Sequence, residues 1–324
     1  MIRLPVLLEP AAMHIPDGFL SVTIAILCWV ITAIILLLAI ARTRGEFSER
    51  QIPLMGVMAA FIFAAQMINF PVAGGTSGHL LGGALAAIML GPWAGILVMA
   101  SVIIVQGLLF QDGGLLVMGA NILNMGLVTA LIGYGLYRGV ASRSLRLRLS
   151  VAGIAAWLSV MAGALVTSLQ LWLSGTVSLK IVLPAMLGIH ALIGIGEALI
   201  TVAALAFILR TRPDLLEPGE GQARAGRSWV VAGIILVVFV LMLSPIASIN
   251  PDGLERVAID LGFIQHSQTA SSGLLRDYTI PFLGKTSLST ILAGLLGALV
   301  VVVVIILVVR LVGRRRPQSP KSPK

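Results

Sequence analysis

The chain has 324 residues, of which 58% are hydrophobic and 11% are charged, whereas an ordinary soluble domain has roughly 45–50% and 25%. This composition excludes a soluble globule. The net charge of +9 comes from basic residues in the short gaps between apolar runs, so membrane topology explains it and nucleic-acid binding is not expected.

Apolar runs recur along nearly the whole chain, and a bilayer core about 30 Å thick needs about 20 such residues per helical span. The sequence therefore predicts an all-α integral membrane protein with about nine transmembrane helices. The runs, bounded by charge, Pro or Gly, place the helices at about 20–41, 52–69, 78–90, 93–110, 115–137, 150–173, 182–209, 229–247 and 286–312. The third run is short for a full span, and the sequence leaves open whether it is tilted or partly re-entrant.

The pattern predicts two membrane modules joined by a polar linker. Residues 13–210 form a seven-helix module, and the Pro-, Gly-, Glu- and Arg-containing stretch 211–228 is a cytoplasmic linker. Residues 229–312 form a two-helix hairpin with a polar outer loop, and 313–324 form a basic cytoplasmic tail. Residues 1–12 lack a signal-peptide pattern, so we expect them to be dispensable or a mis-assigned extension.

Basic residues predict the orientation of the helices. With the N-terminus outside, seventeen of the 22 Lys and Arg residues lie in cytoplasmic gaps or in the tail, and five lie outside. Because an excess of Lys and Arg marks cytoplasmic loops, we expect an outside N-terminus and a cytoplasmic C-terminus. Cys28 is the single cysteine, so neither an intramolecular disulfide nor a thiolate metal cluster is expected.

Two histidines mark the outer side of the predicted bundle. His14 precedes the first helix in a turn-like sequence with Asp17, and His79 ends the Gly-rich polar segment 69–79 between two helices. Alone, His14 is better explained as a surface residue, and His79 alone is weak evidence for a metal site. Together, on one face of the membrane, they suggest a metal site, because imidazole suits Ni, Co, Cu and Zn.

Three polar residues of the Gly-rich segment have two open interpretations. Asn69, Thr76 and Ser77 could orient His79 through hydrogen bonds, or they could satisfy backbone groups of a membrane loop.

The other polar candidates at membrane depth have structural explanations. Asp112 falls at an outer helix end and is expected to support loop structure. His190 and Glu197 are seven residues apart, so they share one helix face and are expected to form a buried structural pair. The triplet 284–286 is Gly-Lys-Thr, but Thr279 stands where a phosphate-binding loop needs its first glycine, so no ATPase site is encoded.

Four motifs, in order, resemble the CbiM/NikM family, the substrate-capture components of energy-coupling-factor transporters for cobalt and nickel. They are MHIPDGFLS, INFPVAGGTSGHLLGG, QGLLFQDGGLLVMGANILNMG and GIHALIGIGEALIT, and they cover about residues 13–210. The later string SPIASINPDGLERVA resembles the PDGLE domain, which is related to the accessory subunit CbiN.

The resemblance implies a metal site built from nitrogen atoms. In the family the ligands are the free amine of the initiator methionine, the backbone nitrogen and imidazole of the next histidine, and a second loop histidine; here these are Met13, His14 and His79. Four nitrogen ligands in one plane suit Ni(II) or Cu(II) and can accommodate cobalt. The sequence does not distinguish cobalt from nickel. Because an amine joined to Ala12 cannot be a ligand, we expect translation to start at Met13; the alternatives are removal of the extension or an altered site.

The resemblance also implies partners in the cell membrane of a prokaryote: a transmembrane coupling subunit and cytosolic ATPase subunits. Co(II) or Ni(II) is then the cargo, and no resident cofactor is expected. One alternative is a stand-alone secondary transporter that uses His190 and Glu197, although the two halves show no repeat. A membrane-embedded metalloenzyme is the other, although the chain has no His-Glu-x-x-His pair.

Overall fold

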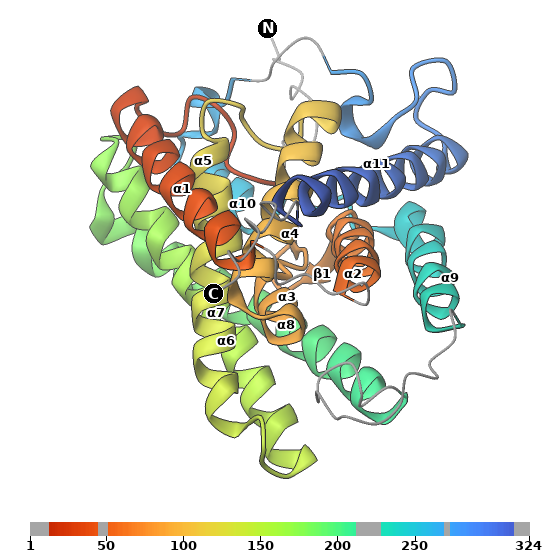
Figure 1. Cartoon of the computed structure of the whole chain (residues 1–324). Helices are drawn as coiled ribbons and strands as arrows, with labels where there is room; N and C mark the ends of the chain where they lie inside the picture. The colour runs from red at the N-terminus through yellow and green to blue at the C-terminus, as the bar shows by residue number, and fades with distance from the viewer. Residues whose placement is uncertain (1–12, 45–50, 212–227, 269–272, 314–324) are drawn as a thin grey trace, which may run out of the picture.

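The computed structural model describes residues 13–44, 51–211, 228–268 and 273–313, and it is almost entirely helical (Figure 1). The helices are α1 (Val22–Thr43), α2 (Gln51–Gln66), α3 (Gly83–Leu90), α4 (Pro92–Val105), α5 (Met118–Asn121), α6 (Thr129–Tyr137), α7 (Leu145–Leu173), α8 (Leu179–Thr211), α9 (Ser228–Leu243), α10 (Gly253–Asp260) and α11 (Ser287–Gly313). The predicted extension 1–12, almost all of the linker and nearly the whole tail lie outside the described residues.

The prediction of about nine apolar helices is confirmed, and the chain is an integral membrane protein. Among the described residues, seven helical stretches are long and apolar enough to cross a membrane. The other two predicted runs correspond to α2, with 16 residues, and α3, with 8.

Helix α3 corresponds to the third apolar run, for which the sequence left open whether it is tilted or partly re-entrant. Its 8 residues rise only about 12 Å, which is too short to cross the bilayer core. Seven of them are buried, and the flanking Gly82 and Gly91 both have φ of 81°. Because glycine adopts positive φ without steric cost, these two residues let the chain begin and end α3 sharply. The third run is therefore an internal helix enclosed by its neighbours α4 and α6.

Helices α9 and α11 of the predicted hairpin pack against α2 (Figure 1). Their buried residues, such as Leu241 and Val301, join one apolar cluster with Met55 and Phe63 of α2. The C-terminal helices are thus part of the same core as the first module.

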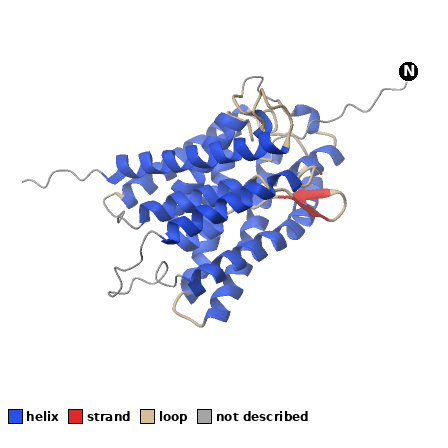
Figure 2. Ribbon diagram, turned by 90° about the vertical axis from the view of Figure 1, so that its right-hand side faces the viewer, coloured by secondary structure: helices blue, strands red, loops and turns tan. Residues whose placement is uncertain are grey.

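The polar segment 69–79 forms a small hairpin that sequence periodicity did not predict. Strand β1 (Phe70–Val72) pairs antiparallel with β2 (Thr76–Gly78), and Phe70 lies opposite Gly78. Helix α2 ends at Gln66, three residues before the predicted end. Figure 2 shows the hairpin at one end of the helical bundle, which we call the hairpin end.

Two turns of π-helix interrupt the helices near the hairpin end. One spans Gln106–Phe110 after α4, and the other spans Ile122–Val128 between α5 and α6. Such turns are frequent at functional sites because the extra residue redirects the side chains around it. At the opposite end, α7 begins at Leu145, so Arg146 and Arg148 belong to the helix and not to the predicted gap.

Candidate metal-binding site

The segment before α1 is fixed to the bundle by Asp17. Its carboxylate accepts three backbone N–H groups that precede α5, from Leu115 at 3.1 Å, Leu116 at 3.0 Å and Val117 at 3.1 Å. Free N–H groups at the start of a helix need such acceptors, and a carboxylate also complements the helix dipole. Asp17 is therefore an anchor for the N-terminal segment.

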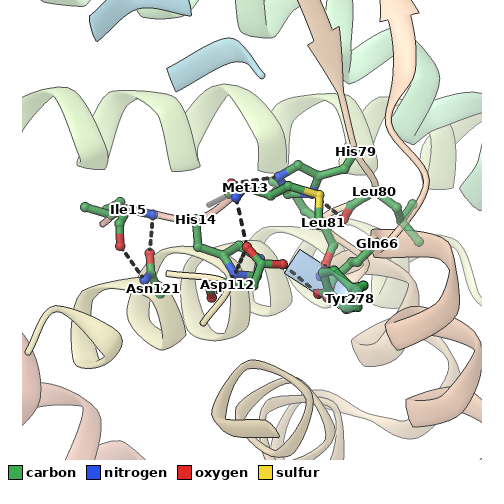
Figure 3. Close-up of polar contacts among 10 residues, drawn as sticks. All are labelled: Met13, His14, Ile15, Gln66, His79, Leu80, Leu81, Asp112, Asn121 and Tyr278. Carbon is green, nitrogen blue, oxygen red and sulfur yellow. Dashed lines mark hydrogen bonds and ion pairs between the residues drawn. The ribbon is translucent and has the colours of Figure 1, made fainter. Parts of the chain in front are cut away.

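Asn121 fixes the same segment at a second point. Its Oδ1 accepts the Ile15 N–H at 3.0 Å, and its Nδ2 donates to the Ile15 carbonyl at 3.1 Å (Figure 3). Both residues are buried. Sequence reasoning missed Asn121, although a side-chain amide within an apolar run was a signal for it.

His14 is buried in contact with Asp112. Its Nδ1 lies 3.0 Å from the Asp112 backbone carbonyl and 3.5 Å from Asp112 Oδ1. Since a carbonyl oxygen only accepts, we assign the proton of a neutral imidazole to Nδ1. The lone pair is then on Nε2, which is buried and has no hydrogen-bond partner among the described residues. The Met13 N–H donates to Asp112 Oδ1 at 2.8 Å, so Asp112 holds both candidate ligands (Figure 3).

His79 follows β2 directly and faces the N-terminal segment. Its Nδ1 lies 3.0 Å from the Leu80 carbonyl, and its Nε2 lies 3.1 Å from the Met13 carbonyl. The His14 and His79 rings are 5.6 Å apart in an edge-to-face arrangement (Figure 3). A neutral imidazole donates through one nitrogen only, so two flanking carbonyls leave one unfavourable contact unless a positive charge is present.

Glu197 of α8 fixes the chain that follows His79. Its Oε2 accepts the Leu81 N–H at 2.6 Å and its Oε1 accepts the Gly82 N–H at 2.9 Å. Gln66 Nε2 donates to the Leu81 carbonyl at 2.8 Å. Glu197 is fully buried, and both of its oxygens accept backbone hydrogen bonds from this loop.

The predicted pairing of His190 with Glu197 is wrong in detail. His190 Nδ1 hydrogen-bonds instead to the Met186 carbonyl at 2.8 Å, one turn back in its own helix. The described residues show no hydrogen bond or ion pair between His190 and Glu197. Seven residues along a straight helix put them on one face but about 10 Å apart, so each needs its own partner.

The polar residues of the hairpin contact the C-terminal module instead of His79. Ser77 Oγ donates to the Asn250 carbonyl at 2.8 Å, and the Ser77 N–H donates to the Pro251 carbonyl at 2.8 Å. The Asn69 carbonyl accepts the N–H of Ser248 at 2.7 Å. Of the two interpretations, satisfaction of backbone groups is the one observed for Ser77. Thr76 is buried in the same hairpin.

A cavity of about 80 Å³ lies beside the two histidines. Met13, His14, His79 and His190 line it together with Asp252, the aspartate of the PDGLE sequence. A second cavity of about 490 Å³ adjoins it and shares Met13 and Asp252 as walls. Burial raises the pKa of Asp252 to about 7. The Glu255 N–H donates a hydrogen bond to this carboxylate, and that bond lowers the pKa by a smaller amount. The candidate ligands therefore border a space that could hold an ion.

Comparison with protein families gives two matches. Residues 14–215 match the CbiM family, described as the cobalt uptake substrate-specific transmembrane region. Residues 227–314 match the PDGLE domain.

Several curated proteins and a solved structure are similar to this chain. A putative fused nickel transport protein NikMN of Archaeoglobus fulgidus is 38% identical over 289 residues, which are 88% of this chain and 94% of that protein. The cobalt transport protein CbiM of Geobacter sulfurreducens is 32% identical, over 72% of this chain and 70% of its own length. The crystal structure of a truncated transition metal transporter, 32% identical, superposes with a TM-score of 0.55 and covers 61% of this chain and 98% of that one.

Proposed function

This chain belongs to the CbiM family and is a membrane protein of cobalt and nickel transport with a PDGLE domain. From that premise we propose that it captures Ni(II) or Co(II) at Met13, His14 and His79. We further propose that the hairpin end faces the outside of the cell, and that separate ATPase subunits and a transmembrane coupling subunit drive uptake.

The arrangement of His79 carries this proposal. Its Nδ1 is held by the Leu80 carbonyl, and its Nε2 points at Met13. Metal-binding histidines commonly donate one ring N–H to a backbone carbonyl, which aims the other nitrogen at the ion. A cation between His79 Nε2 and Met13 would also remove the repulsion between the imidazole lone pair and the Met13 carbonyl. The buried Nε2 of His14 has no hydrogen-bond partner among the described residues, which also supports a polar or charged ligand at this place.

Side chains alone do not supply enough ligands. Among the described residues, no group of three or more His, Cys, Asp and Glu is arranged to hold a metal ion. Backbone or terminal nitrogens must complete the set, as the amine of Met13 and the amide of His14 would do. The amine exists only in a chain whose first residue is Met13. Chelation through His14 Nδ1 also requires that nitrogen to leave the Asp112 carbonyl, 3.0 Å away.

Metal binding by purified protein tests the proposal. A chain that begins at Met13 should bind Ni(II) or Co(II) tightly by titration calorimetry and release protons, because metal displaces them from the nitrogen ligands. A chain that retains residues 1–12 should bind more weakly, since it lacks the amine.

Histidine variants then identify the ligands. His79→Ala should abolish tight binding without loss of membrane insertion, whereas His266→Ala should bind as wild type because this histidine is exposed on the C-terminal loop. His190→Ala should affect folding or transport more than equilibrium binding. Wild-type affinity in His79→Ala together with lost affinity in His190→Ala would show that the site is wrong.

Transport assays test the partners and the orientation. Uptake of radioactive nickel should require the coupling and ATPase subunits, and uptake that persists without them would instead support the secondary transporter. A reporter fused after Lys324 should be cytoplasmic and one inserted near Gln265 should be outside. If both reporters were on one side, the proposed topology of the two-helix hairpin at residues 229–312 would be refuted.

A further inference from the structure

One carboxylate connects the C-terminal module to the candidate metal ligands. The Tyr278 hydroxyl donates to Asp112 Oδ2 at 2.7 Å, while Asp112 Oδ1 accepts the Met13 N–H at 2.8 Å (Figure 3). Tyr278 and Asp112 are both buried. Tyr278 therefore reaches the ligand segment through a single intermediate residue, although it is separated from Asp112 by 166 positions in the sequence.

Backbone strain is concentrated at this contact. Among the described residues, three residues other than glycine have positive φ: Gln111 at 56°, Asp277 at 52° and Tyr278 at 54°. All three belong to the contact or adjoin it. The left-handed conformation is unfavourable for each such residue, because its Cβ comes close to the following carbonyl oxygen. Strain of this kind persists only where surrounding contacts impose it, and it is typical of functional sites.

The packing around Tyr278 restricts the direction of its hydroxyl. Its ring stacks on Phe110 with centroids 4.6 Å apart and planes 18° from parallel, and it meets the Phe63 ring edge-on at 6.1 Å. The Leu275 N–H donates to the Leu109 carbonyl at 3.0 Å, which fixes the chain just before Tyr278. Burial and the nearby Asp112 charge raise the pKa of Tyr278 well above its ordinary value. The phenol thus remains a hydrogen-bond donor at physiological pH.

We propose that Tyr278 is a positioning residue for the bound metal ion. Its hydroxyl orients the Asp112 carboxylate, which in turn holds the Met13 nitrogen. The C-terminal module thereby completes a site whose ligands all come from the first module. This inference rests on the proposed function, because it assumes that Met13 and His14 bind the transported cation.

The Tyr278→Phe variant isolates the hydroxyl. It preserves the ring stack on Phe110 and removes the hydroxyl that donates to Asp112. Residues that orient metal ligands typically change affinity by about 10–100-fold, so we expect Ni(II) to bind about 10-fold more weakly. The Ni(II) absorption spectrum should also shift, because the ligand geometry changes. Tyr134→Phe is the matched control, since Tyr134 lies in α6 and lines neither cavity.

A double-mutant cycle tests whether Tyr278 acts through Asp112. Asp112→Asn alone should also weaken Ni(II) binding, and adding Tyr278→Phe to it should have little further effect, because residues in one network are not additive. Hydrogen exchange at residues 13–17 of the metal-free protein gives a second readout, and we expect faster exchange in both single variants.

The outcomes separate this inference from the proposed function. If Tyr278→Phe retains wild-type affinity and spectrum while His79→Ala abolishes binding, the positioning role is overturned and the metal site stands. Fully additive losses in the double variant would also overturn it. If His79→Ala itself binds normally, the proposed function fails first.

Discussion

Replacing Glu197 by Gln should loosen the loop that presents His79. In the wild type, both carboxylate oxygens accept backbone N–H groups, from Leu81 at 2.6 Å and Gly82 at 2.9 Å. A glutamine of nearly the same size can accept one of these hydrogen bonds. Its NH₂ group then faces the other N–H, so one buried donor meets another donor.

The cost of this change follows from the two hydrogen bonds. A hydrogen bond to a charged group contributes about 1.5–3 kcal/mol, a neutral one about 0.5–1.5, and an unsatisfied buried donor costs about 1–3. A neutral amide is cheaper to bury than a carboxylate, which offsets part of the loss. We expect the loop to open more easily by about 2 kcal/mol, which is a factor of about 30 in the population of the open form.

Hydrogen exchange measured by mass spectrometry checks this estimate. Peptides that contain Leu81 and Gly82 should exchange about 30-fold faster in Glu197→Gln, and Ni(II) affinity should fall because His79 belongs to the same loop. Thr201→Val is the matched control: Thr201 lies one turn further along α8, is fully buried, and its hydroxyl has no hydrogen-bond partner among the described residues. Wild-type exchange in Glu197→Gln would refute the reasoning.

Three further predictions concern the junction with the C-terminal module. Ser77→Ala loses the 2.8 Å hydrogen bond from the Ser77 hydroxyl to the Asn250 carbonyl. The free energy of local opening at residues 250–255 should fall by about 1 kcal/mol, so their hydrogen exchange should become faster. Unchanged exchange would contradict this. Gly253→Ala places a new methyl 2.7 Å from the Cδ1 atom of Ile193, so thermal stability in detergent should fall by about 1–3 kcal/mol. A variant as stable as wild type would show that α10 moves freely. Because the pKa of Asp252 is raised from 3.8 to about 7, the folded protein binds this proton more tightly than the unfolded chain and loses stability as pH rises between those values. Asp252→Asn should flatten that part of the unfolding profile, and a superimposable profile would disprove the assignment.

The hydropathy of the sequence was sufficient to predict most of the helices. Each apolar run became a helix because a bilayer forces the backbone to satisfy its own hydrogen bonds, and a helix does so within one segment. The β1–β2 hairpin was not predicted because three-residue strands are too short to show alternation. The buried Arg148 was misplaced in a gap, since charge alone does not reveal that its Nε donates to the Tyr137 hydroxyl at 3.0 Å.

Candidate ligands were easier to predict than the residues that hold them. His14 and His79 stand out as ionisable groups in an apolar sequence, and the structure brings their rings to 5.6 Å. Asn121 and Tyr278 act through contacts with residues 106 and 166 positions away. No local period encodes such contacts, so only the folded chain reveals the partners of these two residues.

The anchor at Asp17 limits how far Met13, the first of the proposed ligands, can move. Asp17 is fixed by three backbone N–H groups, and four residues of extended chain reach at most about 14 Å. In a chain that begins at Met13, the terminal amine would be a tethered ligand, with a local concentration on the order of millimolar or more around the ion. An amine that dissociates from the ion would therefore bind it again before the ion diffuses away. Under the proposed function, delivery of the metal would require the anchored loops to separate, and this separation would be a step at which release of the ion could be controlled.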